Sequence, residues 1–138
     1  MENKPLSLLE LNSLVRRSIT SCLPDEYWVQ AELSDVRVNY SGHCYLEFVQ
    51  KDATGNALLA KARGIIWANV FTRLRSYFER ETGQAFVSGL KVLVKVTVDF
   101  HELYGYSLTV VNIDPPIPWA IWYAVARKFS GSWMRRES

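Results

Sequence analysis

Cysteine is scarce in this chain, and no segment is apolar enough to enter a membrane. Cys22 and Cys44 are the two cysteines in 138 residues, too few for a disulfide framework and too far apart for a metal-binding knuckle. No apolar run approaches the roughly 20 residues that span a bilayer, and residues 1–5 lack the basic and apolar regions of a secretory signal. We therefore expect reduced thiols and a cytoplasmic protein without a membrane partner.

Motifs for catalysis, metal binding and phosphate binding are also missing. There is no glycine-rich phosphate loop, and no carboxylate pair or nucleophile with a base. His43 and Cys44 are neighbours on a predicted strand and would point to opposite faces, so they cannot chelate one ion. His101 and Glu102 share a short loop without further ligands, and Asp99 and Glu102 are expected to solubilise that region. We expect no metal site, cofactor or catalytic residue here.

The positive charge is concentrated at the C-terminal end. The full chain has a formal net charge of +2. Residues 1–115 contain 12 Lys and Arg against 13 Asp and Glu, a net charge of −1, whereas residues 116–138 contain four basic residues and one acidic residue. The overall charge is therefore no evidence that the folded part binds nucleic acid. Only the local arrangement of basic side chains bears on that question.

The strongest structural pattern is an alternating segment late in the chain. Within residues 91–100, valine recurs at every second position from 92 to 98, which is typical of a strand with one buried face. A five-residue link, 101–105, ends at Gly105, which can adopt a positive φ. Residues 106–113 are again strand-like. Together these segments predict a long antiparallel hairpin.

Two helices are predicted beside the strands. Ser7 and Glu10 form a capping box at the start of the first helix, and Pro24 ends it. The residues on its apolar face, which we expect to be buried, are Leu8, Leu11, Val15, Ile19 and Cys22. Apolar residues at helical spacing from position 68 predict a second helix that ends at Gly83.

Three more strands are predicted between the helices, at residues 28–34 with an extension toward Arg37, at 43–50 and at 58–67. The side chains expected to face inward from the second strand are Cys44, Leu46 and Phe48. The small residues of the third strand that suit close packing are Ala60, Ala62 and Gly64.

The order helix, three strands, helix, two strands is the layout of an OB-fold. We therefore predict a mainly-β fold, a five-stranded Greek-key barrel with an N-terminal helix and a helix between strands three and four. No internal repeat interrupts the pattern, and the length suits one domain.

Fragments in the first predicted helix and in each predicted strand also resemble one family. They are LLELNSLVRR at 8–17, Trp28-Val29, Glu32-Leu33-Ser34, Ser41-Gly42-His43, Tyr45, Arg63, Lys91-Val92-Leu93-Val94, Tyr104-Gly105 and Leu108. As an ordered set, they resemble the N-terminal domain of the exodeoxyribonuclease VII large subunit over about residues 5–115. Ala31 departs from the glycine that is common in the family.

The resemblance implies a role in degrading single-stranded DNA to oligonucleotides. It implies that this OB domain holds the DNA, and that a catalytic region absent from this chain cuts it. The resemblance also implies assembly of the parent protein with several copies of a small helical subunit. By this interpretation the chain alone cuts nothing.

The resemblance also divides the chain. We predict a helix and OB domain at 1–115 and a tail at 116–138 that is unlike the charged helical linker of the family. Three of the five tryptophans fall in this tail. One hypothesis is a non-native end produced by a shifted reading frame, and the other is an unusual natural terminus. Translation of the other two frames after codon 116 distinguishes them.

The candidate DNA-binding residues combine cations that follow the phosphate backbone with aromatic rings that stack on bases. On the first three strands and their loops they are Arg37, Tyr40, His43, Tyr45, Lys61 and Arg63. In the hairpin loop and just after it they are His101, Tyr104 and Tyr106.

Each candidate also has a purely structural interpretation. Tyr45 and Tyr106 are equally compatible with cross-strand packing pairs, and Lys61 and Arg63 with a solvated strand face. The alternative to a DNA-binding domain is therefore an OB module that mediates protein assembly, with little direct DNA contact.

Overall fold

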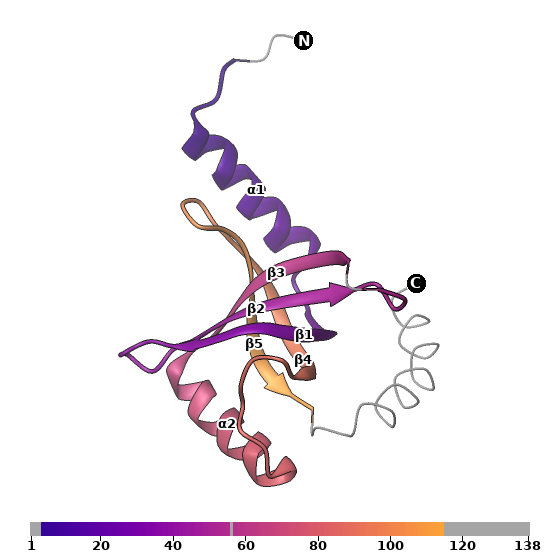
Figure 1. Cartoon of the computed structure of the whole chain (residues 1–138). Coiled ribbons are helices and arrows are strands. Elements are labelled where there is room, and N and C mark those ends of the chain that lie inside the picture. Colours follow the sequence, from indigo (N-terminus) through magenta and orange to yellow (C-terminus); the bar gives the residue numbers. More distant parts are fainter. Residues whose placement is uncertain (1–3, 56, 115–138) are drawn as a thin grey trace.

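Five strands form the body of the molecule and two helices flank it in the computed structural model (Figure 1), which describes residues 4–55 and 57–114. The predicted tail at 116–138 lies outside the described residues. The elements in chain order are α1 (Leu8–Cys22), β1 (Glu26–Val38), β2 (Cys44–Lys51), β3 (Leu58–Ile66), α2 (Ala68–Thr82), β4 (Lys91–His101) and β5 (Gly105–Ile113).

The strands close into a barrel in the order β1-β2-β3-β5-β4. The long strand β1 pairs with β4 along its first half and with β2 along its second half, and its register shifts between Leu33 and Asp35. The β3–β5 pair is parallel and consists of Gly64 with Leu108 and Ile65 with Thr109, whereas the other pairs are antiparallel. This topology, with a helix between β3 and β4, confirms the predicted OB-fold.

Helix α2 covers one end of the barrel. Phe71, Leu74 and Phe78 are its buried residues, and Phe86, in the segment after the helix, stacks edge-on against both phenylalanines. The helix ends at Gly83 as predicted, and this C-cap residue adopts the left-handed conformation at φ 69°.

The interior consists of the inward-facing residues of the strands. The predicted inward face of β2 is confirmed, since Cys44, Leu46 and Phe48 are all buried. Burial raises the pKa of the Cys44 thiol to about 11, so this side chain is neutral and packs as a small apolar group. Close packing at Gly64 is also confirmed, because a Cβ there would collide with the Phe48 ring.

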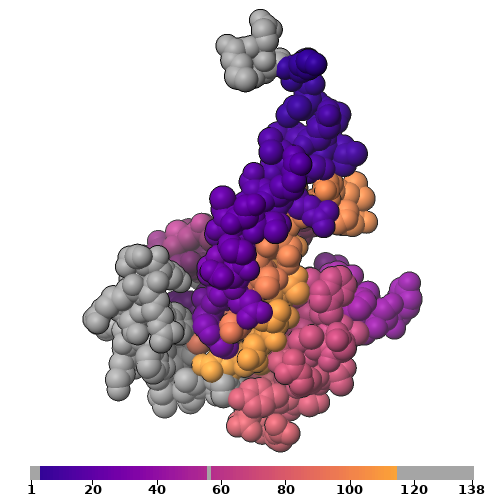
Figure 2. All heavy atoms as spheres, turned by 180° about the vertical axis from the view of Figure 1, so that it is seen from behind, coloured from indigo at the N-terminus to yellow at the C-terminus, as the bar shows by residue number. Residues whose placement is uncertain are grey.

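Helix α1 has the predicted capping box between Ser7 and Glu10, but the predicted buried stripe is wrong. No residue of the helix is buried, and α1 extends beyond the barrel beside the tip of the β4–β5 hairpin (Figures 1 and 2). The narrow hairpin offers too little apolar surface to cover the helix. Of the residues predicted to form this stripe, Leu8 and Leu11 are 73% and 45% exposed, Val15 and Ile19 are half-buried, and Cys22 is exposed.

The β4–β5 hairpin is present, with a shorter link than predicted. His101 pairs with Gly105, so three residues connect the strands rather than five. Gly105 has the expected positive φ, at 83°. Among the helices of the described residues, none has the length and apolar character needed to cross a membrane.

Candidate nucleic-acid interface

The outer face of β1, β2 and β3 displays four of the predicted binding residues. Arg37 is the cross-strand partner of Tyr45, and Glu47 is the partner of Arg63. Since side chains alternate along a strand and Leu46 and Phe48 point inward, these partners point outward. We use "outer face" for the outward-pointing residues Asp35, Arg37, Tyr45, Glu47, Lys61 and Arg63.

Carboxylates lie among the cations of the outer face. Arg37 forms an ion pair with Asp35 at 2.9 Å, and Lys61 forms one with Glu47 at 3.6 Å. The Ser34 hydroxyl donates a hydrogen bond to Glu47 Oε1 at 2.7 Å. This hydrogen bond, followed by the charge of Lys61, lowers the pKa of the Glu47 carboxyl. Glu47 therefore stays ionised at neutral pH, and an incoming phosphate must compete with it for Lys61.

Arg63 differs from the other two cations because its partners are neutral. Its guanidinium donates hydrogen bonds to the backbone carbonyl oxygens of Tyr104 and Tyr106. Arg63 thereby reaches from β3 to the end of the hairpin loop and the beginning of β5. Carbonyl oxygens orient the guanidinium without cancelling its charge, so Arg63 keeps a full positive charge on the outer face.

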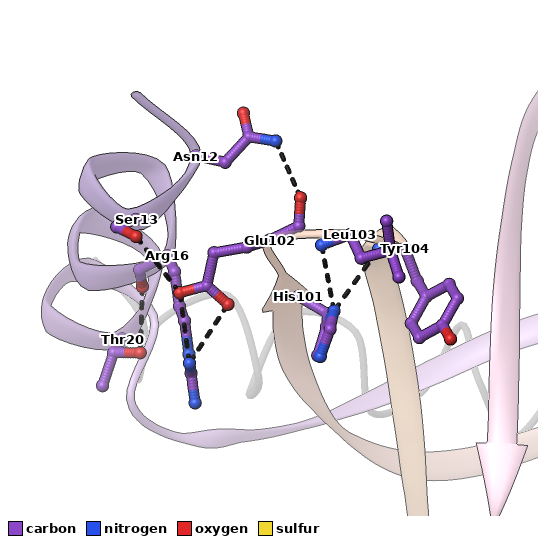
Figure 3. A network of polar contacts seen from close by, with 8 residues as sticks. All are labelled: Asn12, Ser13, Arg16, Thr20, His101, Glu102, Leu103 and Tyr104. Carbon is purple, nitrogen blue, oxygen red and sulfur yellow. Dashed lines mark hydrogen bonds and ion pairs between the residues drawn. The ribbon is translucent and has the colours of Figure 1, made fainter. Parts of the chain in front are cut away.

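Two loops beside the outer face carry exposed tyrosines. In the β1–β2 loop, Asn39 Oδ1 accepts hydrogen bonds from the amides of Ser41 and His43 at 3.0 and 2.9 Å. This turn leaves Tyr40 fully exposed. In the hairpin loop, His101 Nδ1 accepts from the amide of Leu103 at 3.0 Å (Figure 3).

The His101 and Tyr104 rings form a tilted pair in the hairpin loop. Their centroids are 4.9 Å apart, and Tyr104 is 65% exposed. The tyrosine ring therefore has a partner on one side and remains accessible to a base.

His43 lies in the β1–β2 loop, two residues before Tyr45, and contacts the start of α2. Its Nδ1 accepts a hydrogen bond from the Ala68 amide at 2.9 Å, and its ring meets Trp67 edge-on at 5.0 Å. The N-cap residue, Trp67, supplies no side-chain acceptor, so His43 satisfies an amide that the helix itself cannot. A DNA contact of His43 stays a prediction.

Tyr106 belongs to a different surface. It is in phase with the buried residues Leu108 and Val110 of β5, so its side chain faces the interior side of the barrel wall, at the end opposite α2. The structure thus brings together Arg37, Tyr45, Lys61 and Arg63, with Tyr40, His101 and Tyr104 on flanking loops. His43 adjoins this group but its ring is engaged at the start of α2, and the structure separates Tyr106 from the group.

The sequence did not indicate the polar contact between α1 and the hairpin. Glu102 forms an ion pair with Arg16 at 3.2 Å and accepts a hydrogen bond from Ser13, and its carbonyl accepts from Asn12 (Figure 3). Glu102, expected to solubilise the hairpin, therefore also attaches the hairpin to α1. No local pattern could reveal this contact, because Ser13 and Glu102 are 89 residues apart.

The described residues contain no group of three or more His, Cys, Asp or Glu side chains close enough to hold a metal ion. The chemistry available on the outer face is therefore that of aromatic rings, cations and their carboxylate partners.

A closed five-stranded barrel with a helix between β3 and β4, bearing rings and cations on β1–β3, defines the OB-fold class of binding domains. Residues 6–114 match the family described as "OB-fold nucleic acid binding domain", and the chain belongs to that family.

Two known proteins are similar to this chain. It is 37% identical over 114 residues to the exodeoxyribonuclease 7 large subunit of Deinococcus radiodurans, a match that covers 80% of this chain and 27% of that relative. This confirms the resemblance inferred from the sequence fragments, over about a quarter of the relative's length. The Cdc13 DNA-binding domain, solved in complex with a single-stranded telomeric DNA 11-mer, has a TM-score of 0.50 and 10% identity. That match covers 74% of this chain and 70% of the Cdc13 domain and concerns the fold alone.

Proposed function

We propose that this domain binds single-stranded DNA across the outer face and its two flanking loops. It would serve as the DNA-holding domain of an exodeoxyribonuclease VII large subunit. In that setting the DNA is degraded to oligonucleotides by a catalytic region outside this chain, and a small subunit joins the assembly. The identity to the Deinococcus radiodurans protein supports this context.

The position of Arg63 is the observation that carries the proposal. Two backbone carbonyl oxygens orient its guanidinium, and in the part of the chain that the structure describes no carboxylate forms an ion pair with it. Tyr45 on β2 and Tyr104 in the hairpin loop supply exposed rings nearby. A single strand needs this combination, because cations follow its phosphates while rings stack on its bases irrespective of sequence.

The expected affinity is modest. Residues 1–115 carry a net charge of −1, and two of the three cations of the outer face are in ion pairs. Long-range attraction to DNA is therefore weak, and binding depends on contacts that salt screens readily. Measurements belong at low ionic strength.

A salt titration of the full chain tests the proposal. We would measure binding to oligothymidylate of about 16 nucleotides, the upper end of what one OB-fold covers, between about 50 and 200 mM salt. Loss of one phosphate contact in Arg63→Gln should reduce the slope of log affinity against log salt by about 0.7. Tyr45→Ala should lower affinity about 5- to 100-fold through lost stacking.

Arg73→Gln is the matched control, because Arg73 is an exposed arginine on α2. It should leave the salt slope and the affinity unchanged. Equal effects of Arg63→Gln and Arg73→Gln would contradict the proposal. So would unchanged binding in Arg63→Gln and Tyr45→Ala when both variants retain a folded barrel.

Protein assembly is the second candidate function, and the exposed leucines of α1 favour it. Leu8, Leu9 and Leu14 are 73%, 65% and 46% exposed on a helix that projects from the barrel. If assembly is the main role, Leu8→Gln should abolish self-association or partner capture while Tyr45→Ala changes neither. Sedimentation of both variants with and without oligothymidylate separates the two functions.

A further inference from the structure

Within residues 4–55 and 57–114, the end of the barrel opposite α2 is uncovered, and its interior contains a pocket of about 360 Å³. We call this pocket the barrel mouth. All five strands contribute to it, and its walls include Tyr27, Ala31, Ala60, Ala62, Val98 and Tyr106. The buried residues Phe48, Val96 and Leu108 also line it.

Small side chains and diverging strands explain why the mouth is hollow. Ala60 and Ala62 line the pocket with side chains too small to fill it. The predicted close packing is confirmed for Ala62, which packs against the core, but Ala60 is exposed. The parallel pairing of β3 with β5 is confined to Gly64 and Ile65, so the earlier residues of β3 lack β5 partners. Helix α2 fills the other end with phenylalanines, and no helix among the described residues lines this one apart from Leu23 at the end of α1.

The mouth is continuous with the outer face. Lys61 lines the mouth and also pairs with Glu47 on the outer face. Tyr106 lines the mouth with its side chain, while its carbonyl accepts a hydrogen bond from Arg63. A strand held by Arg63 and Lys61 therefore passes the rim of this pocket.

We propose that the barrel mouth accepts one unstacked nucleobase of the single strand. This rests on the proposed function, and it adds a base-binding pocket to a backbone-binding surface. The volume is at the small end of sites for small molecules, which suits a planar base. Tyr27 and Tyr106 offer rings for stacking, and the alanine and valine walls offer apolar contact, as in pockets that hold a base removed from a stack.

The chemistry of the walls also sets the selectivity. Apolar walls cannot read the hydrogen-bonding edge of a base, and the polar side chains of the mouth, such as Gln50 and Lys61, lie at its exposed rim. The pocket should therefore accept any base, with preference set by stacking strength.

Methyl NMR of the full chain locates the base directly. Oligothymidylate should shift the methyl resonances of Ala60, Ala62 and Val98 through the ring current of the bound base. An abasic oligomer of the same length should leave them in place. If only the outer-face residues respond to oligothymidylate, the proposed function stands and the pocket proposal fails. If no residue responds and no binding is detected, both fail.

A pocket-filling variant provides an independent readout. Ala60 is exposed at the rim, so Ala60→Leu should fold while it blocks entry, and it should weaken oligothymidylate binding about tenfold. Ala85→Leu is the control, because Ala85 is equally an exposed alanine and does not line the mouth. Unchanged affinity in Ala60→Leu, or equal loss in both variants, would overturn the proposal.

Discussion

His43 shows how one side chain can serve the fold at a position that also suits a ligand. Its Nδ1 accepts the Ala68 amide, and its edge-on contact with Trp67 fixes the ring. The sequence indicated a polar ring near a turn, which is compatible with both roles. Only the return of the chain at the start of α2 reveals the acceptor role.

We predict that His43→Ala destabilises the domain by about 1 kcal/mol, the usual cost of removing an N-terminal acceptor from a helix. Urea unfolding of the two proteins would measure this difference. His43→Asn, which keeps a side-chain acceptor, should recover part of it. A wild-type free energy of unfolding in His43→Ala would show that the hydrogen bond contributes nothing.

Local patterns predicted the elements of this fold well. The capping box at Ser7, the alternating valines of β4 and the glycine after α2 all depend on neighbouring residues, and each is present. The position of α1 was not predictable, because it depends on Glu102 at the far end of the chain. The inward orientation of Tyr106 could have been inferred from the sequence, since it is in phase with the apolar residues Leu108 and Val110.

The contact between α1 and the hairpin should depend on pH. A hydrogen bond from the backbone at Glu102, followed by the contact with Arg16, lowers the pKa of the Glu102 carboxyl. A lowered folded-state pKa means that the contact is fully present above the ordinary glutamate pKa and is lost as the pH falls through the folded value. The protection of the α1 amides, meaning their exchange relative to the intrinsic rate at the same pH, should therefore fall on acidification below about pH 4.

Glu102→Gln should abolish the pH dependence of the contact between α1 and the hairpin. The variant removes the charge while keeping the shape, so the α1 amides should already have low protection at neutral pH, and this protection should change little on acidification. The barrel amides of β4 serve as the internal control. Identical α1 exchange in the variant and the parent protein would mean that the helix is held by other contacts.

The barrel as a whole is closed by an uneven set of strand pairs. β3 joins β5 through two residue pairs, whereas β4 and β5 pair along almost their full length. Few hydrogen bonds must break to separate β3 from β5, so local opening should begin there. Arg63 crosses between these two strands and adds side-chain hydrogen bonds where the ladder ends.

We predict that the amides of Ile65 and Thr109, which form one of the two β3–β5 pairs, exchange with solvent faster than that of Val96, whose strand forms long antiparallel ladders with both β1 and β5. Hydrogen–deuterium exchange followed by NMR would measure this, and Arg63→Gln should increase the difference. Equal protection of all three amides, at the level set by global unfolding, would show that the barrel opens as one unit.

The divergence of β3 from β5 leaves an incompletely paired strand edge between Leu58 and Arg63. Such an edge invites the backbone of another chain to add as an extra strand, the first step of aggregation. Lys61 and Arg63 lie on that edge, and charged side chains there discourage strand addition. The same two cations therefore protect solubility, and a variant that replaced both with apolar residues would be expected to precipitate.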